Sequence, residues 1–327
     1  MEDQDTYSHL PHVIEMADLN DEKLGYLFKH TNGQLLRPYF FPASDGRGDD
    51  SFSGPGFTQL GAIKYIQNQI EKEEQGTEIY KNLTCFFNWD PKCTPAFDKD
   101  FLNAMRKRLE ASDDGWFIIY RQNHTTSLIK QGNEFLFLDS YNAYGAKDAD
   151  HIPVLENLRA WFPEGNLSVL PDKTQSDYNN CLIFAVEYLV AVLRTMKYEN
   201  QSLAEFKANV PSNKIYPEDE KAKEYKRLGI HVLPGTPECI IEFVQSQENA
   251  LKMAESSHAP EEIKERLMRH IAKKFHKNNL KEMNVNVERR NKEFWFKNVD
   301  DEQIKLFIQD YNKQAEAINK QRNKNDN

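Results

Sequence analysis

The sequence predicts an α+β fold, because a cluster of short β-rich runs is flanked on both sides by stretches with helical periodicity. The β-rich runs are Trp116–Tyr120, Thr125–Lys130 and Glu134–Asp139, and the turn-forming sequences QNH and QGN separate them. This spacing predicts three adjacent antiparallel strands, which we place in a mixed, mostly antiparallel sheet. The flanking stretches alternate apolar and charged residues at helical spacing.

Three further elements complete a predicted core over residues 111–198. Ile152–Trp161 has the pattern of a helix that stops at Pro-Glu-Gly, and Leu167–Leu170 is typical of a short strand. A polar loop then leads into an apolar run that starts at Cys181 and predicts a buried helix. The expected order is therefore three strands, helix, strand, loop and helix.

The regions on either side of this core are predicted to be mainly helical. Residues 1–110 predict a helical lead-in, with amphipathic helices over Gly61–Gln75 and Asp98–Ala111 and an exposed loop over 44–57. Residues 199–327 predict a charged, helical region suited to regulation or partner binding, with disorder over 318–327.

Composition narrows the classes of function. The 327-residue chain has a net charge of -9, which argues against general nucleic-acid binding, since that leaves a basic footprint over a domain. Its four cysteines are too few and too scattered for a disulfide framework, and none forms a C-x-x-C pair. The histidines also lack metal-ligand spacing, so we expect no metal and a reducing compartment.

No pattern in the chain predicts a membrane span. The N-terminal residues contain no apolar stretch preceded by basic ones, so a Sec-type signal is not expected. The longest apolar run, Leu182–Leu193, is interrupted by Glu187 and falls short of the roughly 20 residues that span a bilayer. We expect a cytosolic protein. Export by a specialised secretion system is an alternative that such patterns do not test.

Cys181 is a candidate nucleophile because it stands where the polar loop QSDYNN gives way to the apolar helix. The free N–H groups and positive dipole end of a helix N-terminus stabilise a thiolate. Alternatively, Cys181 is one more small apolar residue of a buried helix, since free cysteines are commonly buried.

His124 and Asp139 are candidates for the base and for the group that orients it. His124 begins a predicted strand and Asp139 ends the next, so a tight hairpin through Gly132 would bring them side by side, with the carboxylate at the ring's Nδ1. Gln175, six residues before Cys181, has a side-chain amide that could donate to a developing oxyanion. Taken singly, these are also ordinary turn, strand-end and loop residues.

In this order the residues resemble the adenain-like cysteine proteases, a group that includes Ulp/SENP deSUMOylases, bacterial deubiquitinases and YopJ-type acetyltransferase effectors. The matching stretch runs from Trp116 to Leu193, in which NHTTSLI, LFLDS and QSDYNNCLIFAVEYL carry the histidine, the acid, the glutamine and the cysteine. The resemblance implies a catalytic triad of Cys181, His124 and Asp139, with Gln175 at the oxyanion. The chain departs from the group at Leu182, where glycine is usual, and in a slightly short hairpin.

The resemblance implies two chemistries. The long helical region after Cys181 is similar to the layout of YopJ-type effectors, which implies acetyl transfer from acetyl-CoA to Ser, Thr or Lys of a host protein. It also implies inositol hexakisphosphate as activator. The alternative is a protease acting on ubiquitin or a ubiquitin-like protein, without a cofactor. Leu182 motivates a third possibility, an inactive binding protein on the same fold.

A basic stripe supplies a candidate polyphosphate site. Its members recur at helical three- and four-residue steps and are Arg266, Arg269, His270, Lys273 and Lys277. Such a cluster suits an inositol polyphosphate or the phosphates of coenzyme A. The other interpretation is a solvated face, partly neutralised by Glu262 and Glu265.

Overall fold

The structure is a computed structural model whose described part contains the whole predicted core except its loops. The described residues are 10–30, 59–70, 76–88, 99–121, 124–140, 152–171, 174–175, 181–211, 225–241 and 243–244, with single positions at 261, 264, 265 and 268. The predicted loop 44–57 and the predicted disordered end 318–327 lie outside these ranges.

Within the described residues, seven strands form one sheet whose spatial order follows the chain, from β1 to β7. The strands are β1 (Val13–Glu15), β2 (Leu83–Phe87), β3 (Asp114–Arg121), β4 (His124–Gln131), β5 (Glu134–Leu138), β6 (Asn166–Val169) and β7 (His231–Val232). The pairs β1–β2, β3–β4 and β4–β5 are antiparallel, and the other three pairs are parallel. The sheet is therefore mixed, with its longest ladder in the predicted β3–β4 hairpin.

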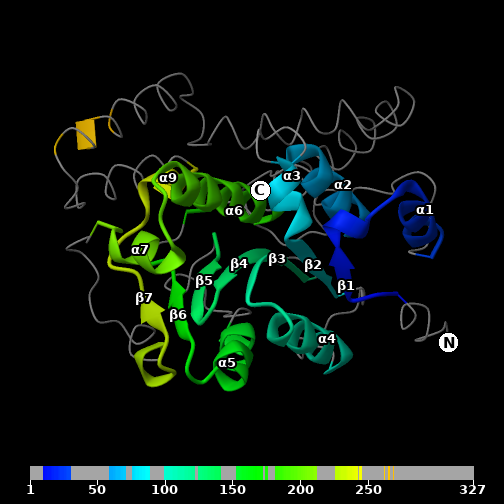
Figure 1. The fold of residues 1–327 in the computed structure, drawn as a ribbon, viewed down its shortest axis with the longest axis horizontal. Helices are drawn as coiled ribbons and strands as arrows, with labels where there is room; N and C mark the ends of the chain where they lie inside the picture. The colour runs from blue at the N-terminus through cyan, green and yellow to red at the C-terminus, as the bar shows by residue number, and fades with distance from the viewer. Residues whose placement is uncertain are drawn as a thin grey trace, which may run out of the picture.

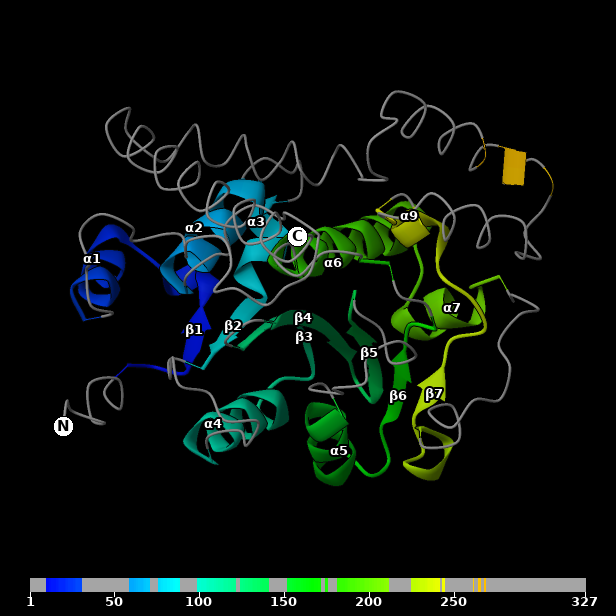
Figure 2. The ribbon, with the colours of Figure 1, turned by 180° about the vertical axis from the view of Figure 1, so that it is seen from behind.

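Helices cover both faces of the sheet, which gives three layers (Figure 1; Figure 2 shows the same layers from behind). The helices are η1 (Met16–Asp18), α1 (Asp21–His30), α2 (Gln59–Ile70), α3 (Gly76–Lys81), α4 (Lys99–Glu110), α5 (Ile152–Trp161), α6 (Cys181–Tyr198), α7 (Leu203–Ala208) and α9 (Glu238–Ile241). Helices α4 and α5 lie on one face, whereas α2, α3, α6 and α9 lie on the other. None of the described helices is long and apolar enough to cross a membrane.

The alternation of side chains along the strands explains the two cores. On β3, Phe117 and Ile119 belong to the cluster under α4 and α5, whereas Ile118 and Tyr120 belong to the cluster under α2 and α6. The same two-residue period divides β4 and β5 between the two clusters. The sheet is thus buried on both sides and its central strands are held in register.

The structure confirms the predicted core elements and adds strands on both sides of them. Helix α5 has the predicted bounds, α6 begins at Cys181 as predicted, and α2 and α4 fall within one or two residues of the expected helix starts. Residues 1–110, predicted as a helical lead-in, also supply the strands β1 and β2. Strand β7 likewise lies in the region predicted to be helical. The division into three segments stays a prediction.

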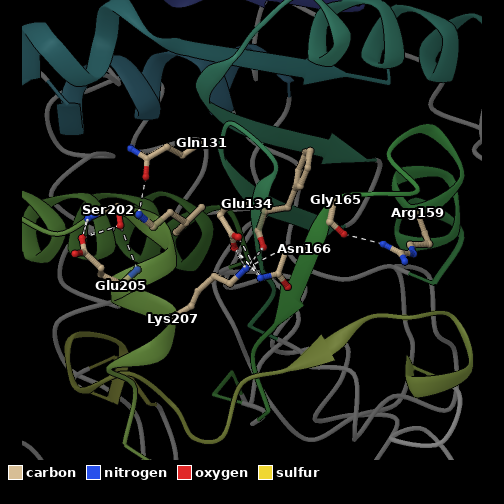
Figure 3. A network of polar contacts seen from close by, with 10 residues as sticks. Gln131, Glu134, Arg159, Gly165, Asn166, Ser202, Glu205 and Lys207 are labelled. Carbon is tan, nitrogen blue, oxygen red and sulfur yellow. Dashed lines mark hydrogen bonds and ion pairs between the residues drawn. The ribbon is translucent and has the colours of Figure 1, made fainter.

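One buried lysine of helix α7 binds the first residues of β5 and β6 (Figure 3). The Lys207 ammonium donates to the Glu134 carboxylate at 2.6 Å and to the carbonyl oxygens of Asn166 and Phe135 at 2.8 and 3.4 Å. Burial lowers the Lys207 pKa, and the hydrogen bond and charge of Glu134 oppose that shift. At the start of α7, Ser202 and Glu205 form a capping box, in which the side chain of each accepts a hydrogen bond from the backbone N–H of the other.

Replacing Lys207 by Met should destabilise the fold by about 2 kcal/mol, because it removes charged hydrogen bonds and leaves Glu134 without them. The matched control is Lys197→Met, whose ion pair with Glu78 is largely exposed and should contribute less than about 1 kcal/mol. Urea unfolding followed by tryptophan fluorescence measures both changes. Equal shifts of the two midpoints would contradict this account of the α7 anchor.

Candidate active site

Cys181 is the first residue of α6, where the predicted nucleophile was expected. Its side chain is almost completely buried, with 5% relative exposure, and the first turn of α6 contains no acidic residue. The three residues that follow, Leu182, Ile183 and Phe184, are buried in the core cluster shared with α2 and the sheet. The start of the helix is therefore held firmly in the core.

His124 and Asp139 lie side by side, as the predicted hairpin requires. His124 opens β4 and Asp139 directly follows β5, with Gly132 in the connecting turn at a positive φ of 56°. The His124 Nε2 to Asp139 Oδ1 distance is 2.8 Å, and both side chains are mostly shielded from solvent. This contact places a carboxylate where it can fix the tautomer and orientation of the ring.

The expectation that the carboxylate meets Nδ1 is wrong, since the contacting ring nitrogen is Nε2. The ring also interacts with Cys181, whose hydrogen bond and charge raise the His124 pKa. The ring is thus bonded to Asp139 on one side and to Cys181 on the other.

The electrostatics of this arrangement favour a charged ring. Burial by itself lowers the His124 pKa, but the charge and hydrogen bond of Asp139 raise it, and the hydrogen bond and charge of Cys181 raise it further. The net result is a His124 pKa of about 10. At neutral pH the imidazolium is flanked by a carboxylate and by the sulfur, which is the arrangement that activates a cysteine nucleophile.

Gln175 lies beside the sulfur, at the place predicted for an oxyanion donor. Its side chain is 1% exposed, and its amide nitrogen Nε2 is 3.8 Å from Cys181 Sγ. The amide oxygen accepts a hydrogen bond from Ser140 Oγ at 2.5 Å. The backbone N–H groups of Thr174 and Gln175 both donate to the Ser140 carbonyl at 3.0 Å. Gln175 therefore lies beside Cys181, and His124 interacts with both Cys181 and Asp139.

Three neighbours of this site are not among the residues predicted from the sequence: Ser140, Thr174 and Tyr120. Ser140 stands next to Asp139 in LFLDS, and Thr174 stands next to Gln175. Their position beside a candidate residue is the feature of the sequence that could have indicated them. Tyr120 was counted only as an apolar strand residue. It is buried on β3, and burial together with the nearby Cys181 charge raises its pKa, so its phenol stays neutral beside the sulfur.

The described part of the chain does not test the predicted polyphosphate site. The basic stripe of Arg266, Arg269, His270, Lys273 and Lys277 lies outside the described residues. Within the described ranges, no three histidine, cysteine or carboxylate side chains gather as they would around a metal ion.

Comparison with known proteins finds similarity to solved structures. No protein-family model matches the chain, and no curated protein matches it. The chain is similar to a structure described as AvrA delL154 with IP6 and CoA, at 10% sequence identity and a TM-score of 0.38. The match covers 73% of this chain and 86% of that one. A likeness at this level carries no argument about activity.

The His124 pKa predicts a pH dependence of stability. An unfolded histidine has a pKa near 6.5 and the folded ring one of about 10, so the folded state binds the extra proton between these values. The stabilisation is therefore complete below about pH 6.5 and is lost as the pH rises through 10. The difference in unfolding free energy between the natural chain and His124→Gln should shrink over this range.

Chemical denaturation at a series of pH values measures this difference. Asp139→Asn is the companion variant, because it keeps the His124 ring but removes the carboxylate that raises the His124 pKa most. This variant should lose most of the pH dependence. Parallel pH profiles for all three proteins would contradict a raised His124 pKa.

Proposed function

We propose that the chain is a cysteine-dependent acyltransferase in which Cys181 is the nucleophile, His124 the base and Asp139 the residue that orients His124. The observation that carries this proposal is the contact of one buried imidazole with both Asp139 and Cys181. A structural cysteine in an apolar helix has no need of a charged ring on its sulfur, and burying such a ring costs free energy unless it is paired.

The first half of the reaction follows from this geometry. The Sγ thiolate attacks the acyl carbon, a C–S bond forms, and the electron pair of the carbonyl moves onto its oxygen. The Gln175 amide nitrogen lies 3.8 Å from the sulfur, and this amide is the candidate donor to that oxygen. Collapse of the intermediate breaks the bond to the leaving group, which takes the proton held by the His124 ring.

The second half uses the same ring as a base. Once Sγ is acylated, it carries no negative charge and no longer bonds to the imidazole as a thiolate. Two of the causes that raise the His124 pKa are then gone, so that pKa falls and the neutral ring is ready to accept a proton. The acceptor group attacks the acyl carbon and gives its proton to His124 as the C–S bond breaks.

The donor proposed first is acetyl-CoA, and the acceptor is a serine, threonine or lysine of a host protein. Support comes from the sequence pattern around Cys181 and from the long charged region after α6. In this proposal inositol hexakisphosphate is the activator, and the basic stripe from Arg266 to Lys277 is the candidate to bind phosphates. Delivery into a host cell by a specialised secretion system belongs to the same proposal.

The alternative is hydrolysis. With water as the acceptor, the same residues would cleave a peptide or isopeptide bond after the tail of ubiquitin or a ubiquitin-like protein. The protonated ring suits this chemistry too, because an amine leaving group requires a proton. The acceptor therefore decides between a transferase and a protease, and experiment must identify it.

Intact-protein mass spectrometry after incubation with acetyl-CoA tests the transferase, with and without inositol hexakisphosphate. The natural chain should gain acetyl groups, and Cys181→Ala should gain none, because the acetyl-enzyme cannot form. Cys239→Ala is the matched control and should behave like the natural chain. If no acetyl is gained under any condition, the transferase is excluded. Labelling of Cys181 by ubiquitin-type probes would then indicate the protease.

Selective alkylation separates an enzyme from an inactive binding protein on this fold. A low dose of iodoacetamide at neutral pH should label Cys181 before Cys85, which lies on β2 with a pKa raised by burial and by Glu15. Asp139→Asn should slow labelling of Cys181 severalfold, because loss of the carboxylate lowers the His124 pKa and so the fraction of the ring that is protonated. Equal labelling of all cysteines, or no effect of Asp139→Asn, would favour the binding protein.

A further inference from the structure

Ser140 joins the triad to the oxyanion side of the site. It follows Asp139 directly, is buried, and donates its hydroxyl hydrogen to Gln175 Oε1 at 2.5 Å. Its carbonyl oxygen accepts from the backbone N–H groups of Thr174 and Gln175, and also from the Thr174 hydroxyl at 3.2 Å. One residue thus fixes both the backbone and the side chain of Gln175.

The segment 174–175 is held from a second direction by α6. The Thr174 hydroxyl forms a hydrogen bond with the hydroxyl of Tyr188, which lies two helical turns along from Cys181 and is fully buried. Ser140 at the end of β5 and Tyr188 on α6 therefore hold Thr174 between them. The position of Gln175 relative to the sulfur is set by both elements.

The orientation of the Gln175 amide matters because its two ends have opposite character. The hydrogen bond from Ser140 engages Oε1, so the NH₂ group is turned toward Cys181 Sγ, at 3.8 Å. A flipped amide would direct Oε1 at the thiolate and at the oxyanion formed during attack, and would repel both. A donor helps this reaction only if it is aimed before the charge develops.

We propose that Ser140 is a positioning residue, which aims the Gln175 amide at the carbonyl oxygen of the acyl group that Cys181 attacks. This inference rests on the proposed function and assigns the residue that orients its oxyanion donor. Ser140 touches neither the thiol nor the His124–Asp139 pair through any hydrogen bond of its side chain recorded among the described residues. Its contribution should therefore appear only in steps that develop an oxyanion.

Two reactions of Cys181 distinguish a loss of oxyanion stabilisation from a general disruption of the site. Acylation by p-nitrophenyl acetate passes through an oxyanion, whereas alkylation by iodoacetamide displaces iodide directly and forms none. Acylation is followed by p-nitrophenolate release or by intact mass, and alkylation by intact mass, both in the full-length chain. The small ester also needs no coenzyme site, so it tests the cysteine independently of acetyl-CoA.

Ser140→Ala should lower the maximal acylation rate about 10-fold, the effect of losing one hydrogen bond of ordinary strength. It should leave the half-saturating ester concentration and the alkylation rate unchanged. Gln175→Ala should lower acylation by about 10²–10³-fold, the usual loss for an oxyanion donor. The double variant should be no slower than Gln175→Ala, because Ser140 acts through Gln175.

Ser127→Ala is the matched control. This serine is fully buried on the neighbouring strand β4, and its hydroxyl has no hydrogen-bond partner in the described part of the chain, so both rates should stay unchanged. Equal loss of acylation and alkylation in Ser140→Ala, or a double variant slower than Gln175→Ala, would overturn the positioning role. A natural chain whose Cys181 reacts with neither reagent would overturn the proposed function and this inference together.

Discussion

The packing of α6 across the sheet is the interaction on which the rest of the molecule depends. Every residue from Cys181 to Val190 is buried, although this stretch includes Glu187 and Tyr188. Each large apolar side chain in such a position contributes about 1.5–3 kcal/mol on burial. The helix therefore cannot rotate or slide without losing much of the core. Because Cys181 is its first residue, the position of the sulfur is fixed by the same packing.

The chemistry is placed at the ends of elements whose middles supply the stability. His124 is the first residue of β4, Asp139 and Ser140 come just after β5, and Cys181 starts α6. Backbone groups at element ends lack their regular partners, and side chains there have more freedom of direction. The buried charge on His124 is compensated by Asp139, so the site keeps a polar cluster within an apolar surrounding.

The predictable parts of the fold were those with local signals. The β4–β5 hairpin has alternating apolar residues and a glycine turn, and α6 has a long apolar run that starts at a polar loop. Strand β2 was missed because it is buried on both faces and pairs in parallel with β3, so LTCFF shows no alternation of apolar and polar residues. Strands β1 and β7 are too short to show any periodicity.

The site shows the same division. The closeness of His124 and Asp139 follows from hairpin register, which sequence spacing can express. The choice of Nε2 over Nδ1 depends on the rotation of one ring toward α6, and no spacing specifies a rotamer. The part played by Ser140 depends on its contact with a residue 35 positions away. A serine after a strand has many ordinary uses, so its type alone predicts nothing.

The sheet order has a consequence for how the molecule is built. Within the described residues each strand lies beside its predecessor in the chain, so the sheet can grow in one direction as synthesis proceeds. By the end of β5 the chain already carries its histidine and its carboxylate, but no thiol in position. Only the docking of α6, more than 40 residues later, brings the sulfur to them. A nascent chain therefore has no activated thiol until α6 has docked on the sheet, and enhanced reactivity at Cys181 is itself a report that this docking has taken place.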